Sequence, residues 1–389
     1  MSQYFLMHKD EVCGSLAIDE NTGMLKGYKD HHTGHSPFLG NADTRRMAKW
    51  WEGRSVPASR KMIQNILKEA GCSNTKDYLA KNLALSMTDS YWICPLDVDL
   101  KYDDIKLSGL FSYEDGKIPY HNHTSYDPNA SLGGQMEKYW NIKDVPPTLI
   151  KESYKYFGQQ AINEGFATLI HDMQDTHVPY TSYTISKTDD NGLYCSCTAF
   201  TREDLELVSA YEILEGSKMQ NDKSLYENYI QICTNLGIDE DRIREFMDYQ
   251  TLTDFIISNT DEHLLNFGVL RNAKTMAYLS SAPIFDSGNS MFYTDSLKEY
   301  TRVELLERKI TSFYDSEEKM LRNIRNKNLV DFDRLPSKDE VIAYYTKYGF
   351  PEERATRIAK NYEAKIGLAY DFCHGKTISL YHEKTRATL

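Results

Sequence analysis

The order of predicted elements between residues 131 and 258 constrains the fold of this chain most. A glycine turn and an extended segment at 137–141 lead through Pro146-Pro147 into a short strand at 148–151 that ends in a lysine. A helix is predicted from about residue 159, because apolar side chains recur there at the spacing of one helical face. These side chains are Ile162, Phe166, Leu169 and Ile170. The pattern therefore predicts a strand followed directly by an amphipathic helix.

Two further strands are predicted after this helix, at 178–185 and 193–200. Residues 189–192 between them, Asp-Asp-Asn-Gly, are the types that a tight hairpin turn requires. Helices are then predicted at 202–214, at 239–258 and over most of 305–370. Strands and one helix first, followed mostly by helices, indicate a small sheet lobe joined to a larger helical lobe.

We therefore predict an α+β fold with two lobes. The small lobe with the sheet is expected at 121–201 and the helical lobe at 202–389. Residues 1–120 mix polar loops with one helical stretch at 59–71, and their role stays open. At 389 residues and 41% hydrophobic content, the chain has enough apolar residues for two or three such units.

Composition and charge narrow the class of protein. No apolar run is long enough to cross a bilayer, and residues 1–11 lack the basic segment and apolar core of a targeting sequence. We therefore expect a cytoplasmic protein with no membrane partner. The seven cysteines contain no C-x-x-C pair, and reduced thiols suit that location. A formal net charge of −12 disfavours broad binding to a phosphate backbone, so we expect no direct nucleic-acid partner.

The strongest chemical pattern is the segment 259–266, Asn-Thr-Asp-Glu-His-Leu-Leu-Asn, which follows the apolar end of a predicted helix. Asp261 and Asn266 stand five residues apart, as in the catalytic loop of protein kinases, where the aspartate accepts the hydroxyl proton and the asparagine reaches magnesium. Downstream, Asp286 begins an Asp-Ser-Gly sequence that matches the metal-binding D-x-G element. Taken singly, such residues are more often helix caps or turn formers, but their joint order favours phosphoryl transfer. Glu262 is expected to add negative charge beside the base and the metal site.

Residues upstream supply the other parts that phosphoryl transfer needs. Lys151 at the strand end and Glu164 in the next helix correspond to the lysine that contacts nucleotide phosphates and the glutamate that orients it. Gly133 and Gly134 allow backbone amides to approach phosphate oxygens closely. Each feature alone is also typical of a solvated surface or an ordinary turn. The succession of strand, helix, hairpin and helix favours the functional interpretation.

Five motifs together resemble a known family. They are Ser131-x-Gly133-Gly134-Gln135-x-Glu137-Lys138, Leu149-Ile150-Lys151, Asn163-Glu164, Asn259-x-Asp261-x-His263-x-x-Asn266-Phe267 and Asp286. The run from residue 131 to about 290 is similar to the HipA family of bacterial serine/threonine kinases. The resemblance implies a two-lobed, protein-kinase-like fold with ATP and Mg²⁺ as cofactors. It also implies transfer of the γ-phosphate to a serine or threonine hydroxyl of a protein substrate.

The resemblance assigns roles to the catalytic and metal-binding residues. It implies that Asp261 is the catalytic base and that Asn266 and Asp286 bind Mg²⁺. It makes Lys151 the nucleotide lysine, with Glu164 as its orienting partner.

The resemblance also assigns residues around the nucleotide. Ser131, Gly133 and Gly134 would form the phosphate loop, and the backbone of Ala199 and Phe200 would contact the adenine. His263 is expected near the nucleotide, where it stabilises the catalytic loop. In the family, phosphorylation of a serine in the phosphate loop ejects that loop and silences the kinase. Ser131 is similar in position, so we expect autophosphorylation there.

The resemblance continues more loosely into the helical remainder, Ser59-Arg60 and residues 89–92, where it points to HipA-like proteins of Gram-positive bacteria. Residues 1–120 do not match the amino-terminal subdomain of HipA toxins. The family's link to toxin–antitoxin systems suggests an antitoxin-like regulator as a partner. The missing match leaves toxin identity and the docking of a HipB-type antitoxin open.

Two other functions stay open. A small-molecule phosphotransferase, like the antibiotic kinases, shares the same loop chemistry. A pseudokinase-like binding module would use the fold only as a docking surface. The set of Lys151, Glu164, Asp261, Asn266 and Asp286 disfavours the module, because a protein without chemistry does not need all five.

Overall fold

The N-terminal region folds around a four-stranded antiparallel sheet in the order β3-β2-β1-β4. Its strands are β1 (Ser2–His8), β2 (Glu11–Ile18), β3 (Leu25–Asp30) and β4 (Tyr91–Pro95). The prediction of mainly polar loops in this region is wrong. Small residues such as Gly14 and Ala17 stand among the apolar residues of β2, so the alternation of apolar and polar side chains that marks a strand is weak there. In addition, β1 pairs with β4, which lies far along the chain, and such pairing is not visible in a local pattern. The computed structural model describes residues 1–40, 42–61, 63–107, 125–134, 136–153, 156–187, 192–294 and 298–387.

Helices accompany the N-terminal sheet. Helix α1 (Thr44–Arg54) and helix α3 (Thr75–Lys81) bury apolar side chains in one cluster with the strands. Helix α2 (Ile63–Glu69) is the predicted helix at 59–71, although it is shorter than predicted. It packs with Tyr78 and Ala130 in a separate small cluster, so it lies beside the start of the expected phosphate loop. A short helix, α4 (Tyr102–Ile105), follows β4.

A second antiparallel sheet, in the order β5-β6-β8-β7, carries the predicted strand–helix–hairpin succession. Its strands are β5 (Lys138–Asn141), β6 (Thr148–Ser153), β7 (Thr184–Lys187) and β8 (Leu193–Thr198). Helix α5 (Gln159–Gln174) buries Ile162, Phe166 and Ile170, which confirms the predicted amphipathic helix. The strand predicted at 178–185 begins later, because β7 covers only 184–187, and residues 188–191 lie outside the described residues.

A third sheet, in the order β11-β10-β9, corrects the prediction of a helix at 202–214. Its strands are β9 (Leu205–Ser209), β10 (Gly268–Asn272) and β11 (Tyr278–Ser281). Helix α6 (Ala210–Glu215) begins only after Ser209, whose side chain forms a capping box with Glu212. The residues of the capping box can be read in the sequence, but the spacing of apolar residues before it is compatible with a helix or a strand. Residues 205–209 form a strand because they pair with β10.

The remaining helices form the large lobe. They are α7 (Leu225–Asn235), α8 (Glu240–Ile257), α9 (Arg302–Glu307), α10 (Glu317–Leu321), α11 (Lys338–Lys347), α12 (Glu352–Cys373) and α13 (Leu380–Ala387). Helix α8 is buried at every residue from 246 to 257 and forms the centre of this core. It ends at Ser258, directly before the segment that carries Asp261.

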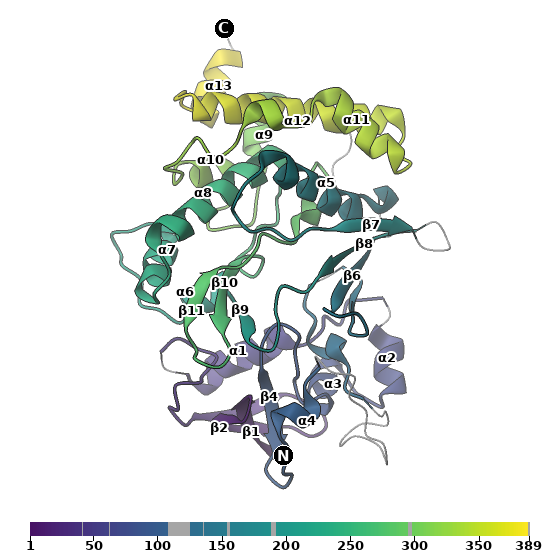
Figure 1. Ribbon diagram of the computed structural model, residues 1–389, viewed down its shortest axis with the longest axis vertical. Coiled ribbons are helices and arrows are strands. Elements are labelled where there is room, and N and C mark those ends of the chain that lie inside the picture. The colour runs from purple at the N-terminus through teal and green to yellow at the C-terminus, as the bar shows by residue number, and fades with distance from the viewer. Residues whose placement is uncertain are drawn as a thin grey trace.

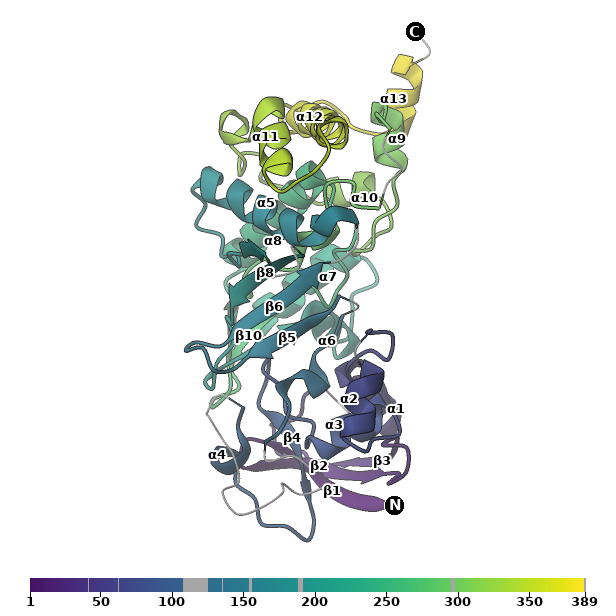
Figure 2. The same ribbon diagram turned by 90° about the vertical axis from the view of Figure 1, so that its right-hand side faces the viewer.

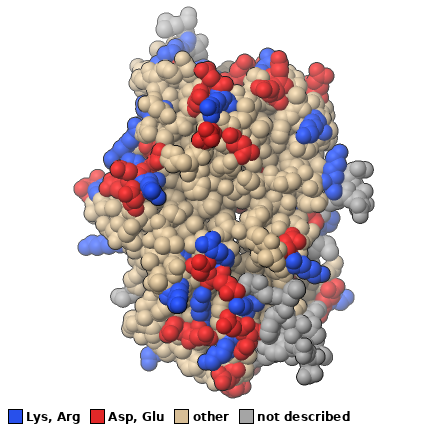
Figure 3. Space-filling view, in the orientation of Figure 1, with Lys and Arg blue, Asp and Glu red and all other residues tan. Residues whose placement is uncertain are grey.

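The chain is an α+β protein with three small antiparallel sheets among its described residues. The N-terminal sheet occupies one end, α11, α12 and α13 occupy the other, and the two further sheets lie between them (Figures 1 and 2). On the face drawn in Figure 3, Lys and Arg lie among Asp and Glu rather than in one basic patch. No helix in the described part of the chain has both the length and the apolar character needed to cross a membrane.

A buried polar network joins the N-terminal region to the third sheet. Glu206 of β9 accepts hydrogen bonds from the Ser90 backbone at 2.8 Å and from the Arg271 guanidinium at 2.8 Å, and its other contact is His8 Nε2 at 2.7 Å. Burial acts to raise the pKa of Glu206, but its contacts with His8 and Arg271 lower it to about 2. The carboxylate is therefore ionised, and removing a partner would leave a buried charge.

Candidate active site

Lys151 lies at the centre of the candidate site and bonds to two carboxylates. Its Nζ donates to Glu164 Oε1 at 2.6 Å, to Asp286 Oδ1 at 2.7 Å and to Tyr183 Oη at 3.1 Å. The second oxygen of Glu164 accepts from the Ser287 backbone at 2.9 Å. Strand β6, helix α5 and the segment after β11 thus bring Lys151, Glu164 and Asp286 together around one ammonium group.

The charges of this group are coupled. Burial acts to raise the pKa of Asp286, but Lys151 and Lys138 outweigh it, so this pKa lies well below its usual range. Burial acts to lower the pKa of Lys151, but Asp286 and Glu164 raise it well above its ordinary value. The Asp286 side chain is 29% exposed, whereas Lys151 is 2% exposed. The structure therefore presents an ionised carboxylate toward solvent, backed by a buried cation.

Asp286 itself has an unusual backbone. Its φ of 66° lies in the left-handed region, which costs a non-glycine residue about 1–3 kcal/mol. The bonds to Lys151 and the contact of its backbone N–H with Tyr183 Oη at 3.4 Å hold it in place. Such strain persists where surrounding contacts fix a side chain for a task.

The catalytic-loop candidates lie next to this group. Asn266 Nδ2 donates to the Asp261 carbonyl at 2.7 Å, which leaves its Oδ1 as the oxygen donor for a metal. Asn289 Nδ2 donates to Asp261 Oδ2 at 2.6 Å. His263 accepts at Nδ1 from the Leu265 backbone at 3.3 Å, which agrees with a loop-stabilising role. Its charged form would act on Asp286, so it lies near the metal-binding candidate.

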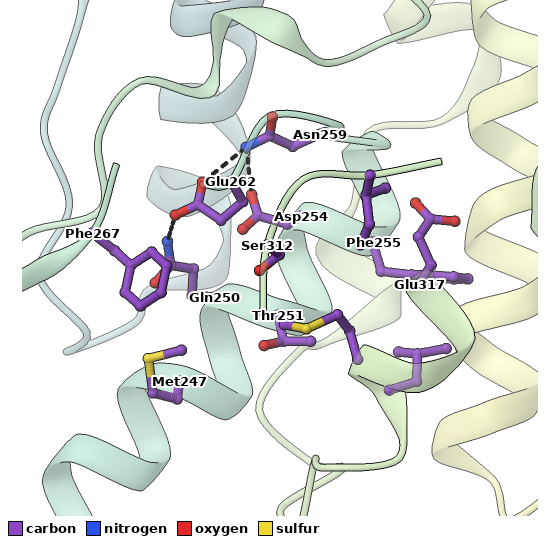
Figure 4. Close-up of a pocket in the computed structure, with 13 residues that line it drawn as sticks. Met247, Gln250, Thr251, Asp254, Phe255, Asn259, Glu262, Phe267, Ser312 and Glu317 are labelled. Carbon is purple, nitrogen blue, oxygen red and sulfur yellow. Dashed lines mark hydrogen bonds between the residues drawn. The ribbon is translucent and has the colours of Figure 1, made fainter. Parts of the chain in front are cut away.

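Glu262, which was expected to add charge beside the base and the metal site, is buried and bonded to neighbouring side chains. It accepts from Gln250 and from Asn259 Nδ2 at 3.1 Å, and Asn259 Nδ2 also donates to Asp254 Oδ1 at 3.0 Å (Figure 4). Glu262 therefore anchors the loop to α8. Asp261 and Asp286 also help to raise its pKa, so its carboxyl group still interacts with the base and metal-binding candidates.

Beneath the loop lies a cavity of about 30 Å³, bordered by this network (Figure 4). Several buried oxygens that border it have no hydrogen-bond partner within the described residues. They are Gln250 Oε1, Thr251 Oγ1, Asp254 Oδ2, Ser312 Oγ and Glu317 Oε1. Burial raises the pKa of Asp254 to about 7, and burial and Asp254 raise that of Glu262 well above its ordinary value. The pair therefore holds a proton near neutral pH.

The expected phosphate loop is held from the N-terminal region. Arg60, which is 6% exposed, donates to the carbonyls of Leu132, Gly133, Gly134 and Lys138 at 2.5 to 3.3 Å. Gly134 has a φ of 84°, a conformation that favours glycine. Because the Arg60 guanidinium donates to all four carbonyl groups, it holds the turn with these carbonyl groups directed toward Arg60.

One of the two backbone groups expected to contact adenine already has a hydrogen bond within the protein. The Ala199 backbone N–H donates to the Pro147 carbonyl at 2.8 Å, so in this conformation it is not available to a ligand. The Phe200 ring lies 5.5 Å from the ring of Phe285, the residue before Asp286. These two rings place the segment beside the metal-binding candidate.

Two cavities border the loop on different sides. Asp261 lines one of about 210 Å³ with Thr260, Asn289, Tyr293, Thr294 and Arg308. Ser131 lines another of about 390 Å³, whose wall includes Leu265 of the loop and Trp50 of α1. The structure thus gives Asp261 a pocket of its own, and Ser131 lies in the neighbouring one.

Sequence reasoning missed Asn289 and Arg60 as parts of the site. Asn289 stands three residues after Asp286 in Asp-Ser-Gly-Asn, and that position was the available signal. Arg60 acts over a separation of 72 to 78 residues. No group of three or more His, Cys, Asp or Glu in the described ranges is arranged to hold a metal. A site with two protein ligands, Asn266 and Asp286, is the kind that Mg²⁺ uses when substrate phosphates supply other ligands.

Of three comparisons with known proteins, only the search of solved structures found similar proteins. A scan against protein-family models and a search of curated proteins both found no match. Among solved structures, the chain is similar to the proinflammatory kinase CtkA of Helicobacter pylori, with a TM-score of 0.43 and 15% identity over 66% of this chain and 93% of that chain. It is also similar to HipA of Shewanella oneidensis MR-1, solved with HipB and its operator DNA. There the TM-score is 0.45 and the identity 12%, over 98% of this chain and 95% of that chain.

Proposed function

We propose that the protein is an ATP- and Mg²⁺-dependent serine/threonine protein kinase. The observation that carries the proposal is the buried Lys151 ammonium, bonded to both Glu164 and Asp286 at 2.6 and 2.7 Å. In phosphoryl transfer, a lysine–glutamate pair and a metal-binding aspartate must stand together beside the nucleotide phosphates. A purely structural ion pair would not need a second, partly exposed carboxylate on the same ammonium.

The chain's own residues supply positioning and charge. Asp261 orients the acceptor hydroxyl in its pocket and takes up the hydroxyl proton, and Asn289 fixes the direction of the Asp261 carboxylate through their 2.6 Å hydrogen bond. Asn266 and Asp286 would hold Mg²⁺, which neutralises charge on the phosphates when bound. Lys151 places positive charge at the same point.

The acceptor in this proposal is a hydroxyl of another protein and of Ser131 itself. The pocket of about 210 Å³ at Asp261 is large enough for a serine or threonine side chain with its neighbouring backbone. Ser131 lies in the adjacent cavity, so its phosphorylation requires movement of the phosphate loop or a second copy of the chain. An antitoxin-like regulator and a cytoplasmic location stay predictions from the sequence.

Formation of ADP tests the proposal. Wild type, Asp261→Asn and the exposed-loop control Asp222→Asn are incubated with ATP, Mg²⁺ and, in separate reactions, a mixture of serine and threonine peptides or a set of small alcohols, and ATP binding is measured alongside. We expect ADP and phosphopeptide from wild type and control, dependence on Mg²⁺, and at least a 100-fold loss in Asp261→Asn. ADP formed only with small alcohols would identify a small-molecule phosphotransferase. ATP binding without turnover in wild type would identify a binding module.

A further inference from the structure

Lys138, the first residue of β5, stands directly opposite Lys151 of β6 in the antiparallel register. Directly opposite residues of such a pair project from the same face, with their Cβ atoms about 5 Å apart. Both lysines therefore belong to the face of the sheet that carries the candidate site. Like charges in this arrangement destabilise a sheet, and the two carboxylates that offset them, Glu164 and Asp286, bond to Lys151 rather than to Lys138.

The three N–H groups of Lys151 are all committed. They go to Glu164, Asp286 and Tyr183, and an ammonium has three donors. Lys151 therefore cannot reach a phosphate oxygen in this conformation without giving up one of these bonds. Lys138 differs, because within the described residues its Nζ has no hydrogen bond or ion pair.

The ammonium of Lys138 lies against the glycine turn of the expected phosphate loop. A Cβ at Gly134 would lie 2.6 Å from Lys138 Nζ, so the ammonium lies directly against the backbone of the turn. Burial, with Lys151 and Arg60, lowers the pKa of Lys138 to about 8 against the raising effect of Asp286 and Glu164. The half-buried cation thus lies near the turn and Asp286, with no direct hydrogen bond or ion pair within the described residues.

We propose that Lys138 is a second phosphate-binding lysine, which contacts the polyphosphate of the nucleotide beside the glycine turn. The proposal rests on the proposed function for the nucleotide, but its chemistry requires only a polyphosphate anion. Lys151 then serves mainly to hold Glu164 and Asp286 together, and Lys138 supplies the donor that is free for the phosphates.

Binding of four probes by calorimetry tests this assignment: ATP, ADP, adenosine and inorganic tripolyphosphate. We expect Lys138→Met to weaken binding of ATP, ADP and tripolyphosphate about 10- to 100-fold, the size of a charge-assisted hydrogen bond, and to leave adenosine within twofold. Lys138→Arg retains the charge and should bind ATP within about fivefold of wild type. The control is Lys143→Met, in the exposed turn of the same hairpin, which should match wild type.

The outcomes separate the two proposals. ATP binding by Lys138→Met equal to wild type, or an equal loss of adenosine and ATP, would overturn the phosphate role of Lys138. Tripolyphosphate binding that depends on Lys138, without ATP binding by wild type, would support the anion site and overturn the kinase proposal. Wild type that binds neither probe would overturn both.

Discussion

Lys151 Nζ lies 2.7 Å from Asp286 Oδ1, although 135 residues separate them in the chain. This contact, with that to Glu164, closes the small sheet lobe onto the segment after β11. We expect Lys151→Met to lower the free energy of unfolding by about 3 kcal/mol, because it leaves two carboxylates beside each other without a cation. Urea denaturation measures the loss. The exposed Lys143→Met should stay within about 0.5 kcal/mol of wild type, and an equally small change in Lys151→Met would contradict the structural role.

Asn289 should affect turnover more than nucleotide binding. Its Nδ2 donates to Asp261, and its Oδ1 accepts from Gln160 at 2.7 Å, so it links the catalytic loop to α5. We expect Asn289→Ala to lower kcat about 10- to 100-fold while KM for ATP stays within twofold, because only the orientation of the base is lost. Steady-state kinetics with a peptide acceptor measures both constants. The surface variant Asn235→Ala should change neither, and a KM effect as large as the kcat effect would place Asn289 in nucleotide binding instead.

Arg60, which lies in the N-terminal region before the two predicted lobes, should affect nucleotide affinity. Without its bonds to four carbonyls, the glycine turn is free to reorient and must be ordered again on binding. We expect Arg60→Gln to raise KM for ATP about tenfold with a smaller change in kcat. Arg60→Lys should recover only part of the affinity, because an ammonium cannot reproduce the planar fork of donors. Arg45→Gln, an exposed change in α1, is the matched control; equal KM values in all variants would exclude the clamp.

Asp254 predicts a pH dependence of stability. Its pKa in the folded protein is raised to about 7 from 3.8, so between these values the folded state holds a proton that the unfolded state has lost. Stability from this group is therefore full below about pH 4 and falls as the pH rises toward 7. Asp254→Asn keeps the acceptor for Asn259 and removes the titration. We expect the variant to gain about 2 kcal/mol relative to wild type between pH 5 and 7, measured by urea denaturation at both values. A constant difference between the two proteins would show that Asp254 does not hold the proton.

The sequence revealed those parts of the site that depend on local periodicity and order. The strand that carries Lys151 and the helix that carries Glu164 are adjacent in the chain, and the stripe through Ile162, Phe166 and Ile170 specifies which face is buried. The spacing of Asp261 and Asn266 likewise marks one loop. Each of these signals falls within a short window, so it is visible without knowledge of tertiary contacts.

Other parts depend on contacts between distant segments. Strand β1 pairs with β4 across most of the N-terminal region, and Arg60 reaches a turn more than 70 residues away. The direction of Glu262 is set by Gln250 and Asn259, which local spacing does not specify. Lys138 was part of the recognised motif, but sequence alone does not show that its ammonium has no hydrogen bond or ion pair within the described residues, whereas all three donors of Lys151 are used.

Transfer of phosphate to the protein itself tests the central claim most directly. Wild type and Asp286→Asn are first treated with phosphatase, then incubated with ATP and Mg²⁺, and analysed by intact-mass and peptide mass spectrometry. The account predicts added phosphate in wild type, at Ser131, and none in Asp286→Asn, because that variant lacks the metal-binding carboxylate. Equal phosphate in both proteins would contradict the role of Asp286. No phosphate in either protein would contradict autophosphorylation.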